Sequence, residues 1–499
     1  MQFDQLSFFQ DALSILPEII VTITLLAVVV LDIIFKDSSL LSNTSLLGLL
    51  GSLFVLLIQW NDPASTSFSG SIQLNVFNIA FCFVVVLSAI LCIFLSTEYV
   101  IRSGMGLAEF LILILGSTLG GMFLCIANEL ITIFVAFECL GLSSYILAGY
   151  AKKDLRSNEA AIKYLLVGGV SSSILAYGFS WLYGLSGGQL QLDYLVNGIA
   201  EHNNNILPVW ISFICILVGI CFKISAVPFH QWAPDVYEGS PTPVVAFLSV
   251  GSKAAGLALA TRILTIVFPS IQQEWHLVLE IFGFLSMMFG NLIAATQTSL
   301  KRMLAYSSIS QAGYLIIGIV ANTPYGYTSM ITYLIIYVFM NLGAFACVVI
   351  FGLRTGTDQI RDYTGLYFKD PWLAFSLSVC LLSLGGIPPL AGFFGKLYLF
   401  WCGWNSGLYL LVYTGLFTSV ISIYYYLRVV KVILTKEAKE MSPYLREYKV
   451  SPFSLIPNNN IEFGITLCVF FSTTLGFVLN PIINTTNQIL ITQKFPMSY

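Results

Sequence analysis

Charged side chains are scarce in this sequence. Asp, Glu, Lys and Arg make up only 9% of its 499 residues, compared with about 25% in an average soluble protein, whereas 57% of the residues are hydrophobic. Apolar stretches long enough to cross a bilayer as helices, about 18 to 25 residues, recur along almost the whole chain. The composition therefore predicts an all-α polytopic membrane protein without a large soluble domain.

Signals of several other protein classes are missing as well. The net charge is -3, and no run of Lys and Arg is long enough to bind nucleic acid. The ten cysteines and three histidines lie singly, without C-x-x-C spacing, so we expect no disulfide framework, metal site or iron–sulfur cluster in this chain. The N-terminal stretch resembles neither a secretory signal nor a transit peptide, so the first spans are expected to direct insertion.

Apolar stretches between polar breaks predict fourteen membrane-spanning helices. Sixteen Lys and Arg residues fall in the odd-numbered loops, and only Arg262 and Lys494 fall on the other side. Short basic loops stay on the side where a chain is synthesised, so both termini are predicted to lie on the opposite side. The predicted spans are 17–35, 41–60, 76–95, 107–126, 130–148, 161–183, 206–229, 241–265, 277–295, 303–320, 328–351, 372–400, 408–430 and 461–479.

Four lysines remain, and all of them fall within predicted spans: Lys163, Lys223, Lys253 and Lys396. A lysine at the centre of a membrane helix costs about 2.5–3.5 kcal/mol on insertion scales. Lys163 lies only a few residues inside its span, so its ammonium group can equally well reach the interface. The other three lie deeper, which favours a function over a purely structural charge.

An internal repeat links two halves of the chain. "SSYILAGY" (143–150) has a counterpart in "SSISQAGY" (307–314), and the span broken at Pro228 has one in "LGGIPPLAGFFGKLYLF" (384–400). Each unit holds five spans, so the two units are predicted to be inverted. Inverted repeats with interrupted helices are typical of transporters with sites near the membrane midplane.

This organisation predicts four parts of the chain. Residues 1–106 form three N-terminal helices, 107–268 the first repeat, 269–435 the second repeat, and 436–499 a loop with the last helix. The broken helices are the seventh and twelfth spans.

Buried acids that could pair with the lysines are few. Glu138, in "FVAFECLGLSS", is the only charged residue between 130 and 151. We predict that Glu138 pairs with Lys223, that Lys253 is a central proton relay, and that Lys396 is the counterpart of Lys223 in the second repeat. Burial and the partner charge act in opposite directions on such a pair, so it can gain or lose a proton at modest cost. A static buried ion pair is the structural alternative.

Other polar residues near the spans are more ambiguous. His230 follows the break at Pro228 and could carry a proton or form a structural hydrogen bond. Glu109 is either an interfacial acid or part of a proton entry path, and Glu129 is placed to favour a helix N-terminus. Asp235 and Glu238 are assigned to a loop, with mainly structural roles.

Several motifs together resemble a known family. The stretches that begin at Lys223 ("KISAVPFHQWAPDVYEGSPTP"), Lys301 ("KRMLAYSSISQAGY") and Ser383 ("SLGGIPPLAGFFGKLYLFWCGW") are similar to subunit 2 of the complex I family, an antiporter-like membrane subunit. "RSNEAAIKYLLVGG" and "LRTGTDQIRDYTGLYFKDP" most closely resemble its chloroplast and cyanobacterial form. The resemblance covers nearly the whole chain.

The resemblance implies a specific function. Such a complex passes electrons from ferredoxin or NAD(P)H, through iron–sulfur clusters of other subunits, to plastoquinone, and pumps protons in cyclic electron flow and chlororespiration. It also implies that Glu138, Lys223, Lys253 and Lys396 carry the proton, and that this subunit holds no cofactor. Its partners would be the other membrane and peripheral subunits, including neighbouring antiporter-like ones. The location would be the chloroplast thylakoid membrane, with a cyanobacterial thylakoid as second choice.

Two alternatives stay open at this point. An Mrp-type cation/proton antiporter subunit shares the fold and the lysines, and the residues alone do not separate it from a complex I subunit. A spacer that holds pumping subunits apart without carrying protons is the other alternative.

Overall fold

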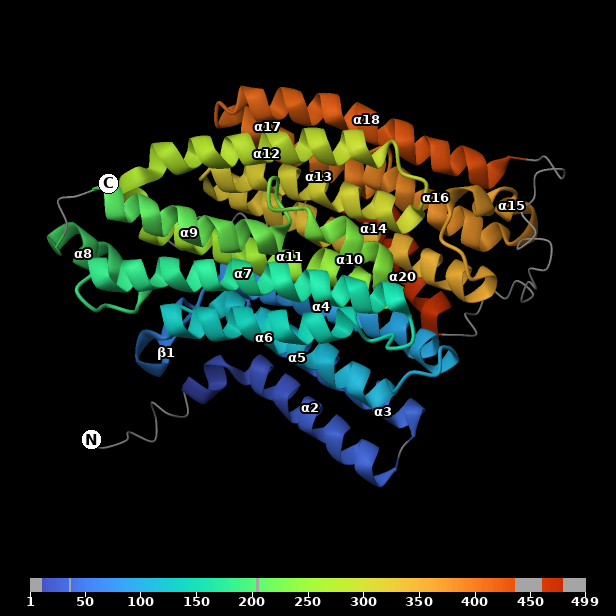
Figure 1. The fold of residues 1–499 in the computed structure, drawn as a ribbon, viewed down its shortest axis with the longest axis horizontal. Coiled ribbons are helices and arrows are strands. Elements are labelled where there is room, and N and C mark those ends of the chain that lie inside the picture. The colour runs from blue at the N-terminus through green and yellow to red at the C-terminus, as the bar shows by residue number, and fades with distance from the viewer. Residues whose placement is uncertain (1–10, 36, 203–205, 436–459, 479–499) are drawn as a thin grey trace.

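The computed structural model describes residues 11–35, 37–202, 206–435 and 460–478. Long helices lie side by side along one direction (Figure 1). Three of them precede the repeats: α2 (Leu16–Ile34), α3 (Ser38–Gln59) and α4 (Val76–Arg102). Between α3 and α4, β1 (Ser65–Ser67) pairs antiparallel with β2 (Ile72–Leu74), with η1 (Phe68–Gly70) between the strands. This hairpin is a small addition to the all-α fold.

The first repeat begins with α5. Its helices are α5 (Leu107–Ile126), α6 (Leu130–Ala148), α7 (Leu155–Leu185), α8 (Leu192–His202), α9 (Ile206–Ile224), α10 (Trp232–Gly239) and α11 (Thr242–Arg262), followed by η2 (Ile263–Val267) and η3 (Pro269–Ile271). α9 and α10 are the two halves of the predicted seventh span.

The second repeat follows the same order. Its helices are α12 (Gln272–Ala294), α13 (Leu300–Val320), α14 (Pro324–Thr355), η4 (Ile360–Tyr363), α15 (Leu366–Lys369), α16 (Pro371–Gly385), α17 (Ala391–Asn405) and α18 (Tyr409–Leu434), and α20 (Asn460–Thr474) comes after it. α5 packs on α6 and α6 on α7, just as α12 packs on α13 and α13 on α14. Five spans in each unit make the repeats inverted, as predicted.

Twelve helices of the described part are long and apolar enough to cross a membrane. The two remaining predicted spans also correspond to helices. The twelfth is divided into the short helices α16 and α17, and the fourteenth begins with α20. The last residue predicted for that span, the termini, and the basic residues Lys436, Lys439, Arg446, Lys449 and Lys494 lie outside the described residues.

Both predicted breaks are present. α9 ends at Ile224, and the chain turns at Ser225, whose φ is 61°. α16 ends at Gly385 and is followed by Gly386, whose φ is +83°. A left-handed residue directly after a helix allows the chain to leave the helix axis. Each break also contains a cis X-Pro bond, at Pro228 and Pro389.

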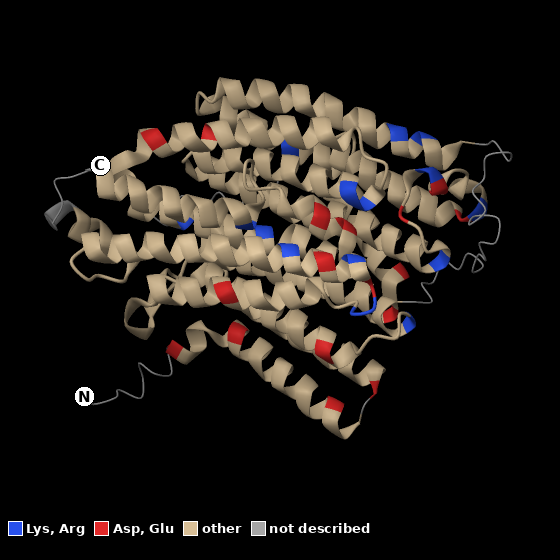
Figure 2. Ribbon diagram, viewed as in Figure 1, with Lys and Arg blue, Asp and Glu red and all other residues tan. Residues whose placement is uncertain are grey.

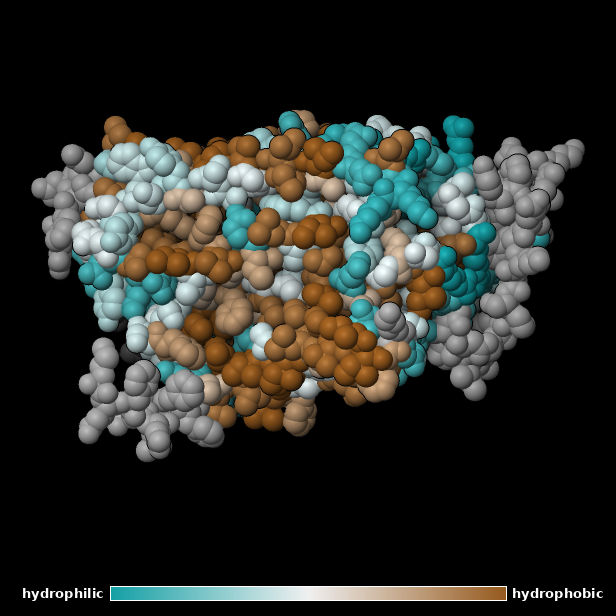
Figure 3. Space-filling model, turned by 60° about the horizontal axis from the view of Figure 1, so that its bottom comes forward, coloured by the Kyte–Doolittle hydropathy of each residue, from teal (hydrophilic) through white to brown (hydrophobic). Residues whose placement is uncertain are grey.

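The core lies where the two repeats meet. Every residue of α11 is buried, as are nearly all residues of α13 and α14, and α11 packs on both. Lys and Arg gather toward one end of the described helices (Figure 2). Hydrophobic residues cover much of the middle of the face in Figure 3. This distribution agrees with the predicted membrane orientation of the loops.

Candidate functional site

Lys223 lies next to the last residue of α9, just before the first break. Its side chain is 1% exposed and crosses α11 at Gly256, where a Cβ atom would lie 3.4 Å from its Cβ and Cγ atoms. Its Nζ lies 4.8 Å from the centre of the Phe137 ring on α6. Within the described chain this Nζ has no hydrogen-bond partner. Among the described residues, this buried ammonium group therefore has a cation–π contact but no hydrogen bond.

The predicted ion pair between Glu138 and Lys223 is not formed. None of the ion pairs among the described residues, taken within 4.0 Å, joins the two side chains. Glu138 follows Phe137 on α6 and is half-buried, and its charge still acts on Lys223. The ammonium group lies over the ring of Phe137, the residue before Glu138. The two groups are neighbours rather than partners.

Lys253 joins the two repeats. It lies in the middle of α11, is 2% exposed, and its Nζ donates hydrogen bonds of 2.9 Å to both the main-chain O and the Oγ of Ser308 on α13. α11 ends the first repeat and α13 belongs to the second. The structure places this lysine at the junction of the two repeats, and its predicted role as a central proton relay stays a prediction.

Lys396 follows its break in the chain, whereas Lys223 precedes its own break. It is on α17, after the break, and its Nζ reaches back to the carbonyl oxygens of Leu384 at 2.8 Å and Gly385 at 3.3 Å. These are the last two residues of α16. Lys396 thus contacts the end of the first half-helix from beyond the break, whereas Lys223 lies on the first half-helix itself. The predicted correspondence between the two lysines stays a prediction.

Polar groups that sequence reasoning missed lie on α13, between its contact with Lys253 and its contact with Lys396. One side of α13 carries Ser308, Gln311 and Tyr314, about one turn apart. Ser308 accepts from Lys253, the hydroxyl of Tyr333 donates to Gln311, and the Tyr314 ring centre lies 5.2 Å from the Nζ of Lys396. The repeat motif "SSISQAGY" contains all three α13 residues, but it does not indicate which side of the helix faces the lysines.

Tyr314 also belongs to a buried hydrogen-bonded cluster. Its hydroxyl lies 3.2 Å from Thr418 Oγ1 and 3.3 Å from the Nδ2 of Asn291, and the hydroxyl of Tyr425 donates to the Oδ1 of Asn291 at 3.1 Å. Hydroxyl groups both donate and accept hydrogen bonds, so this cluster extends the polar interior of the second repeat toward α12 and α18.

His230 lies in the break between α9 and α10 and is half-buried. Its Nδ1 has no hydrogen-bond partner among the described residues. No hydrogen bond or ion pair of the described structure joins it to the lysines of the breaks. It remains a candidate for proton transfer at the first break, separate from the polar groups of α13.

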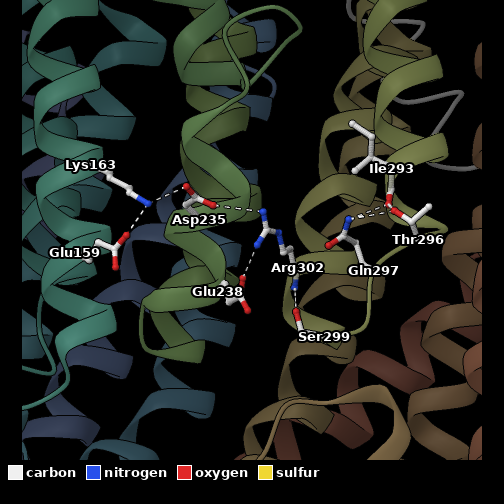
Figure 4. A network of polar contacts seen from close by, with 9 residues as sticks. All are labelled: Glu159, Lys163, Asp235, Glu238, Ile293, Thr296, Gln297, Ser299 and Arg302. Atoms are coloured by element: carbon white, nitrogen blue, oxygen red, sulfur yellow. Dashed lines mark hydrogen bonds and ion pairs between the residues drawn. The ribbon is translucent and has the colours of Figure 1, made fainter.

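A second group of charges lies at the first break (Figure 4). Lys163 on α7 contacts Glu159 at 2.7 Å and Asp235 at 3.0 Å, and Arg302 on α13 lies 3.6 Å from Asp235 and 3.1 Å from Glu238. The loop predicted for Asp235 and Glu238 is wrong, because both lie on α10. The network ties the second half-helix of the break to both repeats.

The remaining polar residues support helix ends. Arg262, which was counted on the side opposite the basic loops, is the buried last residue of α11, where Nη1 donates to the main-chain oxygens of Cys125 and Ala127 at the end of α5. The hydroxyl of Tyr150 contacts Glu109 at 3.4 Å. Burial and this carboxylate raise the pKa of Tyr150, which lies outside the helices, to about 12. Glu109, in the first turn of α5, thus contacts the segment that follows α6.

Comparison with known proteins agrees with this architecture. Residues 127–422 match the family described as "NADH:quinone oxidoreductase/Mrp antiporter, TM", and residues 1–98 match "NAD(P)H-quinone oxidoreductase subunit 2 N-terminal". The chain belongs to the NAD(P)H-quinone oxidoreductase subunit 2 family. It is 67% identical over 98% of its length to the chloroplastic subunit 2 of Zygnema circumcarinatum, and 58% identical over 98% to that of Chlorokybus atmophyticus, covering 99% and 97% of those chains.

Solved structures share the fold of this subunit 2 family member. A chain of respiratory complex I from Thermus thermophilus, with 29% identity, superposes with a TM-score of 0.76 over 94% of this chain and 98% of that one. A chain of the Mrp complex from Dietzia, with 19% identity, reaches a TM-score of 0.83 over 98% of both chains. The second likeness shows the fold alone.

Proposed function

We propose that this chain moves protons across the chloroplast thylakoid membrane as a subunit of an NAD(P)H- or ferredoxin-dependent plastoquinone oxidoreductase. The observation that carries the proposal is the row of buried lysines, Lys223, Lys253 and Lys396, in a core with few acids. Ammonium groups in a membrane interior are costly and mark ion or proton pathways. The electron carriers and the plastoquinone site would belong to other subunits, in a complex that serves cyclic electron flow and chlororespiration.

The contacts suggest how a proton would pass. Lys253 is held by Ser308, and Gln311 and Tyr314 follow on the same side of α13 toward Lys396. A lysine gives up a proton only to an acceptor, and serine, tyrosine and amide groups with intervening water supply such acceptors. Lys223 would exchange protons with the region of Glu138, through water at the first break. A charge change at one lysine then alters the energy of a proton at the next.

Replacement of Lys253 by Met tests this function. Proton uptake into sealed thylakoid vesicles, measured per plastoquinone reduced, is expected to fall or turnover to stop, while blue-native gels show an assembled complex. Lys301→Met is the matched control, since Lys301 forms an ion pair with Asp358 at the basic end. An unchanged proton yield in Lys253→Met would support the alternative that this chain is a spacer that holds pumping subunits apart without carrying protons. Proton flux that depends on sodium would support an Mrp-type antiporter instead.

A further inference from the structure

A cavity between α17 and α18 meets the second break at its inner end. Its volume is about 460 Å³, and Lys396, Gly385 and Gly386 line that end. Aromatic rings line much of the rest, among them Phe400 and Trp401. α18 and α17 lie at the outer edge of the bundle (Figure 1). The cavity therefore leads from the side of the described chain to a buried ammonium group.

The outer part of this cavity is open along the helices. Leu397 is 49% exposed and Trp401 is 61% exposed on α17, and Leu416 is 49% exposed on α18. Trp404 lies at the far end, where its ring packs against Tyr409 and Tyr413. Trp and Tyr gather where membrane helices meet the interface. A molecule dissolved in the bilayer can therefore enter the cavity laterally, between α17 and α18. The entrance lies on the side of Trp404 that faces the middle of the membrane.

Lys396 has no acidic partner in the described structure. α13, α14, α16, α17 and α18 contain no Asp or Glu at all. The repeat motif shows the contrast with the first half, because five residues before its paired serines the first copy has Glu138 and the second has Arg302. A buried charge is usually neutralised by an opposite charge. The second repeat lacks the carboxylate that the first one provides.

The ammonium group retains capacity for a ligand. An ammonium group has three N–H donors, and two of those of Lys396 are directed to the carbonyl oxygens of Leu384 and Gly385. The third N–H is free to bind an oxygen in the cavity that Lys396 lines. A carboxylate would satisfy this N–H and the charge together, whereas a carbonyl oxygen would satisfy only the N–H.

We propose that this cavity binds a long-chain carboxylic acid from the bilayer. The carboxylate accepts a hydrogen bond from Lys396 at the break, and the chain lies between α17 and α18 and extends into the lipid past Leu397 and Leu416. The proposal concerns binding to the protonated Lys396 and does not depend on whether this lysine takes part in proton transport.

Photo-crosslinking of the intact complex tests this site. The probe is a palmitic acid analogue with a diazirine in its chain, and its methyl ester is the matched neutral probe. The acid is expected to label the segment 391–434, located by mass spectrometry, about ten- to hundredfold more efficiently than the ester, as a charge-assisted hydrogen bond implies. Equal labelling by both probes would overturn the proposal, as would displacement of the acid by a short-chain plastoquinone at equimolar concentration.

Two pairs of variants locate the ligand. Ser419→Phe fills the cavity and should reduce labelling at least about tenfold, whereas Val420→Phe is the control because Val420 is 66% exposed on the same helix and does not line the cavity. Lys396→Gln should lose the preference for the acid, and Lys396→Arg should keep it. Undiminished labelling of Ser419→Phe, or an acid preference that survives in Lys396→Gln, would contradict the assignment.

Discussion

The two repeats use one architecture with different charge chemistry at their breaks. In the first repeat the lysine precedes the break, its ammonium group has no hydrogen-bond partner among the described residues, and a carboxylate lies nearby on α6. In the second repeat Lys396 follows the break and is held by two carbonyl oxygens. Ammonium groups thus lie close to both breaks. That of Lys223 has no hydrogen bond to the described residues and can take up a new partner, whereas that of Lys396 is held by two hydrogen bonds.

The difference suggests a division of roles. Lys223 is poised to change its partner when a charge moves near Glu138, while Lys396 is positioned at the end of α16. Lys253 lies between them and binds Ser308. Four sets of substitutions test this contrast, from the largest expected effect to the smallest.

Gly392→Ala should have the largest effect on stability. A Cβ at Gly392 would lie 1.8 Å from the main-chain oxygen of Ser383 and 2.8 Å from the Sδ of Met340, so α17 would have to move away from α16. The cost should reach or exceed the about 1–3 kcal/mol typical of overpacking. Blue-native gels should show little assembled complex.

The matched substitution in the first repeat is Gly256→Ala. A Cβ there would lie 3.3 Å from Ile224 and 3.4 Å from Lys223, and the gain of about 1 kcal/mol in helix propensity offsets this close contact. Assembly should be near that of the unmodified chain. Equal loss of complex in both variants would contradict the difference in packing between the two breaks.

Replacing each break lysine by Met should separate the two sites thermodynamically. Lys223→Met removes a buried ammonium group without a hydrogen-bond partner, so the midpoint of thermal disassembly should stay the same or rise. Lys396→Met leaves the carbonyl oxygens of Leu384 and Gly385 without this donor, which should cost about 1–3 kcal/mol. A lower midpoint for Lys223→Met than for Lys396→Met would contradict this assignment, because it would mean that Lys223 stabilises the complex more than Lys396 does.

Ser308→Ala should have a smaller effect on stability. It removes the Oγ contact of Lys253 but keeps the contact with the main-chain oxygen, so about 1 kcal/mol should be lost. Turnover should fall in part, and Ser308→Thr, which retains a hydroxyl, should restore it. If Ser308→Ala leaves turnover unchanged, the hydroxyl does not belong to the proton pathway.

Lys163→Ala should have the smallest effect on stability. Its ion pairs with Glu159 and Asp235 are at least 40% exposed on each side chain, and such pairs contribute about 0–1 kcal/mol. The thermal midpoint should barely move. A large loss of assembly would show that the network of Figure 4 holds α10 in place more strongly than its exposure implies.

The sequence was sufficient for the spans, the breaks and the three deep lysines, because each depends on local composition. It was not sufficient for contacts between distant helices. Asp235 and Glu238 were assigned to a loop, yet both lie on the short helix α10, and Pro234 fits the first turn of that helix. The place of Gln311 and Tyr314 depends on how α13 faces its neighbours, which polar composition alone does not determine.

The most direct test is the proton yield of a Lys223→Met strain. Proton uptake into sealed thylakoid vesicles would be measured per plastoquinone reduced, with the complex shown to be assembled. The account predicts a lower yield or arrested turnover in a complex of unchanged or higher thermal stability, because the unpaired ammonium group serves proton transfer rather than the fold. An unchanged yield in the same stable complex would contradict it.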